Sequence, residues 1–264
     1  MLVQPAISLN KVSKDFRSSS GRTLPVLSQV SFDVQPGEFV SIIGHSGCGK
    51  TTTLRIVSGL LSPTSGEALV DGKRVARPVN DVGIVFQTPL LMPWLNTLKN
   101  VLLPIDLLGK DTRQHVARAR ELLEVVGLAG VEDLYPRELS GGMQQRVAIA
   151  RALIHNPSIL LMDEPFGSLD ELTREEMAMQ LLEITERLRK TVVFVTHSIQ
   201  EAVLLSDRVV VLSPKPSTVK TDLRISLPRP RSISLTTEPE YLQLCQVLRA
   251  SLGLKVALPE KEAK

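Results

Sequence analysis

The sequence is poor in cysteine and in aromatic residues. Its 264 residues include only two cysteines, Cys48 and Cys245, and only 3% are Phe, Trp or Tyr. So few cysteines argue against a disulfide framework and favour a reducing compartment. Because 43% of the residues are hydrophobic, the chain still has enough apolar material for the core of one large domain or two small ones.

The sequence also lacks a strong charge excess and a long apolar run. Lys and Arg total 31 and Asp and Glu total 28, so nucleic acid is not expected as the main partner. No apolar run approaches the roughly 18 residues that span a bilayer. The N-terminal segment MLVQPAISLNKVSKDF does not resemble a signal peptide. Any membrane role is therefore expected to act through a partner.

Short apolar runs rich in β-branched residues predict strands buried on both faces, as in a parallel sheet. These runs are Phe39–Ile43, Val82–Phe86, Ile159–Met162, Val192–Val195 and Val209–Leu212. Helical patterns lie between or beside them, at Thr51–Leu61, Thr112–Val126, Gly142–Ile154, Thr173–Leu188 and Ile199–Leu205. The alternation of strands and helices predicts an α/β fold.

Two segments depart from this alternation. The block at about 88–155 has only helices and loops, which predicts a helical insertion. After residue 213 proline becomes frequent, and one weak helix is expected at Pro239–Leu252. We therefore expect one domain at 1–213 and a short C-terminal extension at 214–264.

The segment GHSGCGKT, residues 44–51, fits the phosphate-loop pattern G-x-x-x-x-G-K-[ST], between a predicted strand and a predicted helix. Backbone N–H groups of such a loop and the helix N-terminus bind phosphate. Lys50 is expected to reach the β- and γ-phosphates, and the Thr51 hydroxyl to bind Mg²⁺. The expected nucleotide-binding residues are Gly44, His45, Ser46, Gly47, Cys48, Gly49, Lys50, Thr51 and Thr52. Cys48 is interpreted as a passive filler, with a redox role as the alternative.

The run Ile159–Met162 ends in two carboxylates, Asp163 and Glu164. Ligands of open α/β sheets bind beyond the carboxyl ends of the strands, so this pair is expected to meet the phosphate loop. Asp163 suits Mg²⁺, and Glu164 could polarise a water that attacks the γ-phosphate. The alternative is a turn in which Glu164 is merely solvated.

The segment LSGGMQQR, residues 139–146, begins a helix with two glycines, which are poor helix formers. Ser140 is a good N-cap. Gly141 and Gly142 leave the backbone open to an anion, although the chain already has a phosphate loop. A second copy, paired head to tail, would resolve this: its nucleotide would meet Ser140 and the two glycines. An ordinary helix cap is the alternative.

With these motifs in this order, the chain resembles the ATP-binding-cassette (ABC) ATPases over about residues 6–213. LSGGMQQR followed by VAIARAL is similar to the signature sequence of that family. Gln87, the segment Ser168–Asp170 and Thr196–His197 complete the order. The resemblance implies a P-loop NTPase core with a mainly parallel sheet, an antiparallel β subdomain and an inserted α-helical subdomain.

The resemblance also implies a role for each matching residue. Gln87 would contact the Mg²⁺ or the attacking water, Glu164 would be the general base and His197 would bond to the γ-phosphate. Asp170 would bridge the two sites of a dimer, with Ser140, Gly141 and Gly142 acting in trans. Phe16 would stack on adenine, although it could instead pack in the core.

The use of the ATP is inferred from the segment Gln87–Thr97, which contains the only tryptophan, Trp94. In related transporters this region receives a helix of the membrane subunit, and aromatic residues concentrate at interfaces. Packing of Leu90, Leu91 and Trp94 inside the insertion is the alternative.

MPW at 92–94, the segment Ser206–Pro214 and LPRPR at 227–231 resemble the ATPase subunits of bacterial nitrate, sulfonate and taurine importers. The basic tail could instead be a solvated extension. The implied partners are a second copy, two integral membrane permease subunits and, indirectly, a periplasmic or lipid-anchored substrate-binding protein. The implied location is the cytoplasmic face of the inner membrane. An exporter or lipid-handling ATPase, or a soluble cassette ATPase of translation or DNA repair, is the alternative.

Overall fold

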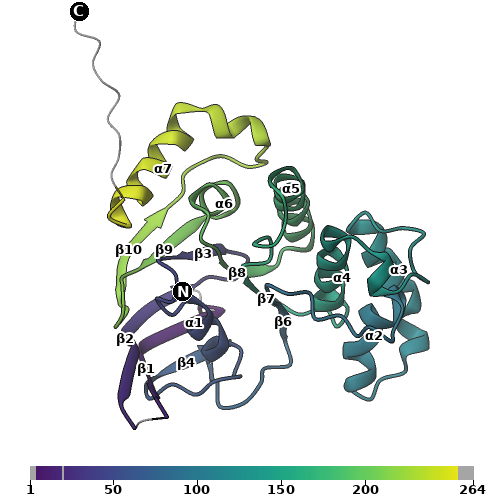
Figure 1. The fold of residues 1–264 in the computed structure, drawn as a ribbon, viewed down its shortest axis with the longest axis horizontal. Coiled ribbons are helices and arrows are strands. Elements are labelled where there is room, and N and C mark those ends of the chain that lie inside the picture. Colours follow the sequence, from purple (N-terminus) through teal and green to yellow (C-terminus); the bar gives the residue numbers. More distant parts are fainter. Residues whose placement is uncertain (1–3, 20, 255–264) are drawn as a thin grey trace, which may run out of the picture.

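The computed structural model describes residues 4–19 and 21–254. Within them lie a six-stranded sheet, in the order β10-β9-β3-β8-β7-β6, and a four-stranded antiparallel sheet, β2-β1-β4-β5 (Figure 1). The first sheet consists of β3 (Phe39–Ile43), β6 (Val82–Val85), β7 (Ile159–Asp163), β8 (Thr191–Val195), β9 (Arg208–Leu212) and β10 (Val219–Arg224). The second consists of β1 (Ile7–Arg17), β2 (Thr23–Val34), β4 (Ser65–Val70) and β5 (Lys73–Arg74).

The centre of the six-stranded sheet is parallel and buried. Val40 of β3 pairs with Val193 on one side and with Arg208 on the other, and all five side chains of β3 are buried. Helices cover both faces of such a sheet, which is why its strands are continuous apolar runs. The five strands expected from those runs are confirmed, each to within one residue at either end.

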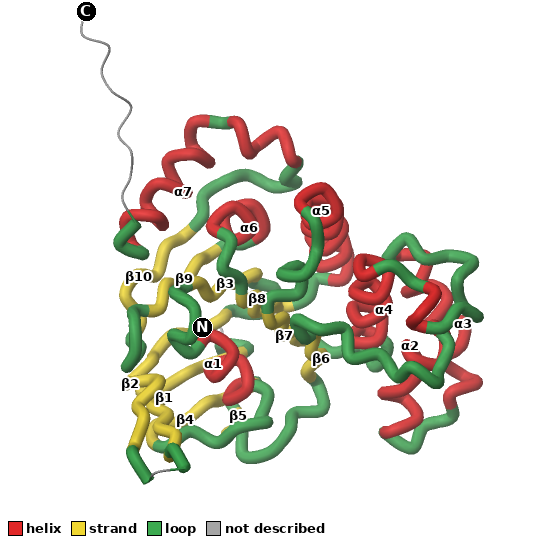
Figure 2. Tube along the Cα trace, in the orientation of Figure 1, coloured by secondary structure: helices red, strands yellow, loops and turns green. Residues whose placement is uncertain are grey.

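Seven α-helices are found in the described residues: α1 (Lys50–Val57), α2 (Thr97–Leu107), α3 (Val116–Val125), α4 (Gly141–Leu153), α5 (Glu171–Leu188), α6 (Ile199–Leu205) and α7 (Pro239–Ser251). Figure 2 shows α2, α3 and α4 grouped beside the β6 edge, whereas α5, α6 and α7 lie over one face of the parallel sheet. Helix α1 packs between the two sheets. None of these helices combines the length and apolar character required to cross a membrane, as far as the described residues go.

Three helix predictions were wrong in detail. Helix α1 ends at Val57 instead of Leu61, because Gly59 turns the chain with φ 77° next to the Arg77 carbonyl. The expected helix Thr112–Val126 is a 3₁₀ turn followed by α3. Helix α2 was missed, because Pro104 inside it is a helix breaker by propensity.

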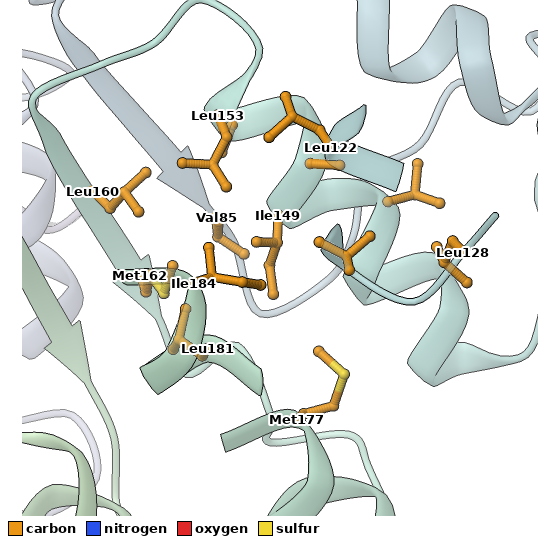
Figure 3. Packing of buried hydrophobic residues seen from close by; sticks show 14 of the residues in the cluster. Val85, Leu122, Leu128, Ile149, Leu153, Leu160, Met162, Met177, Leu181 and Ile184 are labelled. Atoms are coloured by element: carbon orange, nitrogen blue, oxygen red, sulfur yellow. The ribbon is translucent and has the colours of Figure 1, made fainter. Parts of the chain in front are cut away.

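The helical insertion is joined to the sheet by a continuous apolar core (Figure 3). Leu122 of α3 and Ile149 of α4 belong to the same cluster as Val85 of β6, Met162 of β7 and Leu181 of α5. Truncating a buried leucine of this kind to alanine costs about 2–5 kcal/mol. The insertion therefore shares one apolar core with the strands that end at the functional site.

The C-terminal extension packs on the sheet and on α6. Strand β10 pairs antiparallel with β9. The guanidinium of Arg231 donates to the carbonyls of Leu204 and Ser206 at the end of α6, at 2.9 and 2.8 Å. Its side chain is buried, and burial lowers the pKa of Arg231 to about 10. The alternative that the basic tail is merely a solvated extension is therefore wrong for this segment. Arg231 satisfies helix carbonyls that would otherwise have no partner.

Candidate functional site

The phosphate loop connects β3 to α1 with a geometry that needs glycine. Gly49 has φ 111°, and a Cβ there would lie 2.6 Å from Leu27 Cδ2. The Lys50 ammonium is nearly buried and donates to the Gly44 carbonyl at 3.0 Å. No side chain caps the N-terminus of α1. Its first N–H groups are therefore available to an anion.

A cavity of ≈ 820 Å³ lies along this loop. It is bounded by the loop, α1, the ends of β1, β6 and β7, and two segments that come from β2 and from the β9–β10 connection. The lining residues are Phe16, Leu24, Pro25, Val26, Ser46, Gly47, Gly49, Lys50, Thr51, Thr52, Gln87, Glu164 and Lys215. The structure thus brings most of the residues expected at the nucleotide to one cavity.

Glu164 is held between a lysine and a histidine. One carboxylate oxygen lies 3.6 Å from Lys50 Nζ, and the other lies 3.0 Å from His197 Nδ1. The Glu164 backbone has φ 47°, a left-handed conformation that is strained for a residue with a side chain. Its N–H donates to the Val195 carbonyl of β8 at 2.8 Å. The sheet therefore holds the carboxylate at the cavity in spite of this strain.

Asp163, one residue earlier, faces Thr51. The Thr51 hydroxyl donates to Asp163 Oδ1 at 2.9 Å. Burial raises the pKa of Asp163, and the hydrogen bond from Thr51 opposes that change. Burial makes the ionised form of this carboxylate costly, and a bound cation would stabilise that form.

Two side chains near the loop had alternative interpretations. The Phe16 side chain is 39% exposed and lines the cavity, so it lies outside the core. Cys48 is buried, and desolvation raises the pKa of its thiol against the opposing effect of Lys50. Since the thiolate is the reactive form, the structure favours the passive role for Cys48.

The segment after Gln87 leads from the cavity to an exposed apolar surface. Gln87 lines the cavity two residues after the end of β6. Leu91 packs against the core of the helical insertion. Leu90 and Trp94, in contrast, are 52% and 70% exposed, so packing inside the insertion is wrong for these two residues.

The start of α4 lies apart from this cavity. Ser140 caps the helix by accepting from the Met143 N–H at 3.2 Å, which confirms the predicted N-cap. A Cβ on Gly141 would meet nothing within 4 Å, whereas a Cβ on Gly142 would lie 3.0 Å from Thr173 Cγ2. The two glycines therefore differ: Gly142 is constrained by its own chain, and Gly141 faces open space.

Asp170 also has a structural task within its own chain. Its carboxylate caps α5 by accepting from the Thr173 N–H at 3.0 Å. The hydrogen bonds that Asp170 accepts from Thr173 lower its pKa. The side chain is exposed, so a contact across a dimer would be added to the capping bond.

Three features of the site were missed by sequence reasoning. Lys215 lines the cavity from the β9–β10 connection. The His45 ring lies 2.9 Å from the Leu252 carbonyl after α7, so the side chain turns away from the phosphate loop. One residue before His197, the Thr196 hydroxyl donates to the carboxylate of the buried Glu201. The first two depend on contacts between distant parts of the fold, for which no local pattern exists, whereas Thr196 and Glu201 are only five residues apart.

The comparison with protein families decides the family. Residues 27–167, more than half of the chain, match the model of the ABC transporter family. This chain belongs to the ABC transporter ATPase family. The resemblance found in the motifs is therefore confirmed, and so is the enzyme class: the ABC protein binds and hydrolyses ATP.

Named relatives of this ABC ATPase are import proteins. The aliphatic sulfonates import ATP-binding protein of Bacillus cereus is 45% identical, covering 86% of this chain and 88% of its own. The taurine import protein of Rhizobium johnstonii is 43% identical, covering 93% and 96%. The nitrate import protein of Synechocystis sp. is 43% identical, covering 89% of each chain.

A solved structure supports the same family. A dimeric ATP-binding cassette in a post-hydrolysis state, bound to ADP and Pi, superposes with a TM-score of 0.71 at 34% identity. The match covers 84% of this ABC ATPase and all of the other chain. The cassette fold and its activity in ATP hydrolysis are thus shared over nearly the whole described chain.

Proposed function

We propose that this chain is the ATP-hydrolysing subunit of a bacterial importer for a small solute of the sulfonate, taurine or nitrate type. Two copies act beneath two integral membrane permease subunits, on the cytoplasmic face of the membrane. A substrate-binding protein delivers the solute to the permease. The import names of the relatives support this role, and the site supports the chemistry.

The observation that carries the chemistry is the Glu164 carboxylate between Lys50 and His197. Glu164 accepts a proton from the water that attacks the γ-phosphate, and a positioned general base of this kind contributes about 10²–10⁴-fold to the rate. Lys50 binds the β- and γ-phosphates. His197 orients Glu164 and bonds to the γ-phosphate. Phe16 stacks on the adenine at the other end of the cavity.

The donor set near Thr51 fits a magnesium ion. A hydroxyl, the Asp163 carboxylate and the Gln87 amide are oxygen donors, which Mg²⁺ prefers, and water and phosphate oxygens complete its shell. The raised pKa of Asp163 agrees with a position meant for a cation. When bound, Mg²⁺ would neutralise charge that develops on the phosphates. Asp163 and Thr51 would hold it, and Gln87 would contact it or the attacking water and sense the γ-phosphate.

The exposed start of α4 completes the site of a second copy. Gly141 has open space where a side chain would be, and α4 presents its N-terminus there. Such an N-terminus binds an anion. In a head-to-tail pair, Ser140, Gly141 and Gly142 of one copy cap the γ-phosphate held by the other, and Asp170 bridges the two sites. ATP then closes the dimer, and hydrolysis releases it.

The Gln87 segment transmits this closure to the permease. Gln87 lines the cavity together with Glu164, and Leu90 and Trp94 are exposed a few residues later. An exposed aromatic beside an exposed leucine suits the seat of a partner helix. When Gln87 responds to the γ-phosphate, the insertion moves and the permease moves with it.

The test of the composite site is Glu164→Gln. This variant should bind ATP with unchanged affinity, hydrolyse it about 10²–10⁴-fold more slowly and elute as a stable dimer in saturating Mg-ATP. Glu183→Gln, a change at an exposed position of α5, serves as the matched control and should stay active. A Glu164→Gln protein that remains monomeric in Mg-ATP would refute the composite site.

The importer role has a separate test. Tagged protein is recovered from detergent-solubilised membranes of its host, and the accompanying chains are identified by mass spectrometry. A polytopic permease encoded with a secreted binding protein is the expected result, and Trp94→Ala should reduce its recovery without affecting ATP hydrolysis by the chain alone. Recovery of soluble partners only, such as ribosomes or repair proteins, would overturn the importer role and leave the ATPase.

A further inference from the structure

A second lysine, Lys215, reaches the phosphate cavity from outside the phosphate loop. It lies in the connection between β9 and β10, far from the loop in sequence, and lines the same cavity as Lys50 and Thr51. Its ammonium lies 3.9 Å from the position that a Cβ on Gly47 would occupy. Burial raises the pKa of Cys48 in the loop, and the positive charges of Lys50 and, to a smaller extent, Lys215 oppose that change.

The backbone that carries Lys215 is fixed to both walls of the cavity. The Ser217 N–H donates to the Val26 carbonyl at 2.9 Å, and the Ser28 N–H donates to the Ser217 carbonyl at 2.8 Å. The Ser217 hydroxyl donates to the Cys48 carbonyl inside the phosphate loop. Because this serine is buried and held on two sides, the lysine two residues earlier starts from an ordered position. Binding through it costs less conformational entropy than binding through a lysine on a free loop.

The charge of Lys215 is not matched by any carboxylate of the residues that the structure describes. Among the described residues, no carboxylate lies within ion-pair distance of its ammonium, and the side chain is exposed to solvent. Lys50, in contrast, lies 3.6 Å from Glu164. An exposed ammonium beside a loop built for phosphate attracts an anion, and a polyphosphate brings several negative charges.

We propose that Lys215 is a further phosphate-binding residue, whose ammonium donates to the polyphosphate chain of the bound nucleotide. This inference rests on the nucleotide site proposed above. The contact adds affinity for ATP and ADP alike, because both bring a polyphosphate to the loop. Lys215 takes no part in proton transfer, so its loss weakens binding and leaves the rate of the bound state unchanged.

The test compares four variants by titration with ADP and with Mg-ATP and by steady-state hydrolysis. Lys215→Ala should weaken both affinities about fivefold, the equivalent of ~1 kcal/mol for a partly exposed ion pair. KM should rise by the same factor at unchanged kcat. Lys215→Glu should weaken binding further, and Lys215→Arg should restore it. Lys220→Ala, on the exposed face of the neighbouring β10, is the matched control and should bind as the wild type does.

Two results would overturn the inference. One is a Lys215→Ala protein with wild-type affinity for both nucleotides. The other is equal weakening by Lys215→Ala and Lys220→Ala, which would reduce the effect to general surface charge. Lys50→Ala separates this failure from failure of the nucleotide site itself: if Lys50→Ala also retains full affinity, the proposed site is wrong. Unchanged melting temperatures in the Lys215 variants exclude a structural cause.

Discussion

The ends of β7 and β8 and the start of α4 are two regions with opposite organisation. Glu164 and His197 are bonded to each other, and Glu164 also pairs with Lys50, all within one chain. At the start of α4, Ser140 bonds to its own helix, and Gly141 faces open space. The first region is ordered before any ligand binds, whereas the second has a helix N-terminus that none of the described residues covers at Gly141.

The two regions therefore contribute to the site in different ways. Groups that act on the reacting atoms are positioned by the sheet, which tolerates the strained backbone of Glu164 because β8 holds its N–H. The groups that we assign to the site of the second copy lie at the N-terminus of α4, where Gly141 has no side chain. In the pair that we propose, hydrolysis depends on closure, because each nucleotide then lies between groups of both chains.

The largest effect is expected from blocking the open helix start. Ser140→Arg places a long cationic side chain where the nucleotide of the second copy should approach, so hydrolysis should be abolished. ATP binding by a single chain should remain within about twofold of wild type, since Ser140 does not line its own cavity. The measurements are steady-state hydrolysis and equilibrium titration at a concentration at which the chain is monomeric.

Ser140→Ala is the control for the lost helix cap. Both changes remove the bond to the Met143 N–H and should cost about 1 kcal/mol of folding stability. Only Ser140→Arg adds the obstruction. If single-chain ATP binding disappeared in Ser140→Arg, Ser140 would belong to the site of its own chain, and the contrast between the two regions would collapse.

A pH-dependent change in folding stability is expected from Glu201, which bonds to Thr196, the residue before His197. Glu201 is buried, accepts from the Thr196 hydroxyl and lies 3.7 Å from Arg174. Burial raises its pKa, while Thr196, Arg174 and His197 oppose the change and Glu164 adds to it. The folded state therefore holds the proton of Glu201 more tightly than the unfolded state does, in which the pKa is about 4.3.

The sign of the stability change follows from this linkage. The contribution of protonated Glu201 is fully present below about pH 4.3 and is lost as the pH rises through the raised pKa of the folded state. Relative to Glu201→Gln, the wild type should therefore lose stability as the pH rises above about 4.3, as seen in melting temperatures measured over a pH series. Glu183→Gln should show no such trend. A constant difference between wild type and Glu201→Gln would contradict the raised pKa.

The smallest effects should come from the two glycines of α4. Gly141→Ala should stabilise the fold by up to about 1 kcal/mol, because alanine is the better helix former and nothing obstructs its methyl group. Gly142→Ala should gain less, because Thr173 must shift. Denaturant unfolding measures both. Hydrolysis should fall in Gly141→Ala despite its greater stability, and full activity there would show that no partner approaches this face.

The parts of the fold that were predictable are those with a local cause. Strand β3 was predicted residue for residue, because a parallel strand buried on both faces is a continuous apolar run. Helix α2 was not, because Pro104 opposes helix propensity and tertiary packing of Val101 and Ile105 overrides it. Strand β10 was missed as well, since its burial alternates and its partner β9 supplies the order.

The same distinction holds at the site. The phosphate loop and the acidic pair are consecutive residues, so their pattern indicates phosphate and metal chemistry directly. The positions of Lys215 and His45 depend on where β10 and α7 pack, and nothing in their own neighbourhoods indicates that. The roles in trans of Ser140, Gly141, Gly142 and Asp170 remain predictions, because they concern a contact between two chains.

The double attachment of Ser217 has a consequence for nucleotide exchange. By bonding to β2 and to the phosphate loop, it ties two walls of the cavity together. In the pair that we propose, the second copy covers the open side of this cavity. We therefore expect ADP to leave only after the two copies separate.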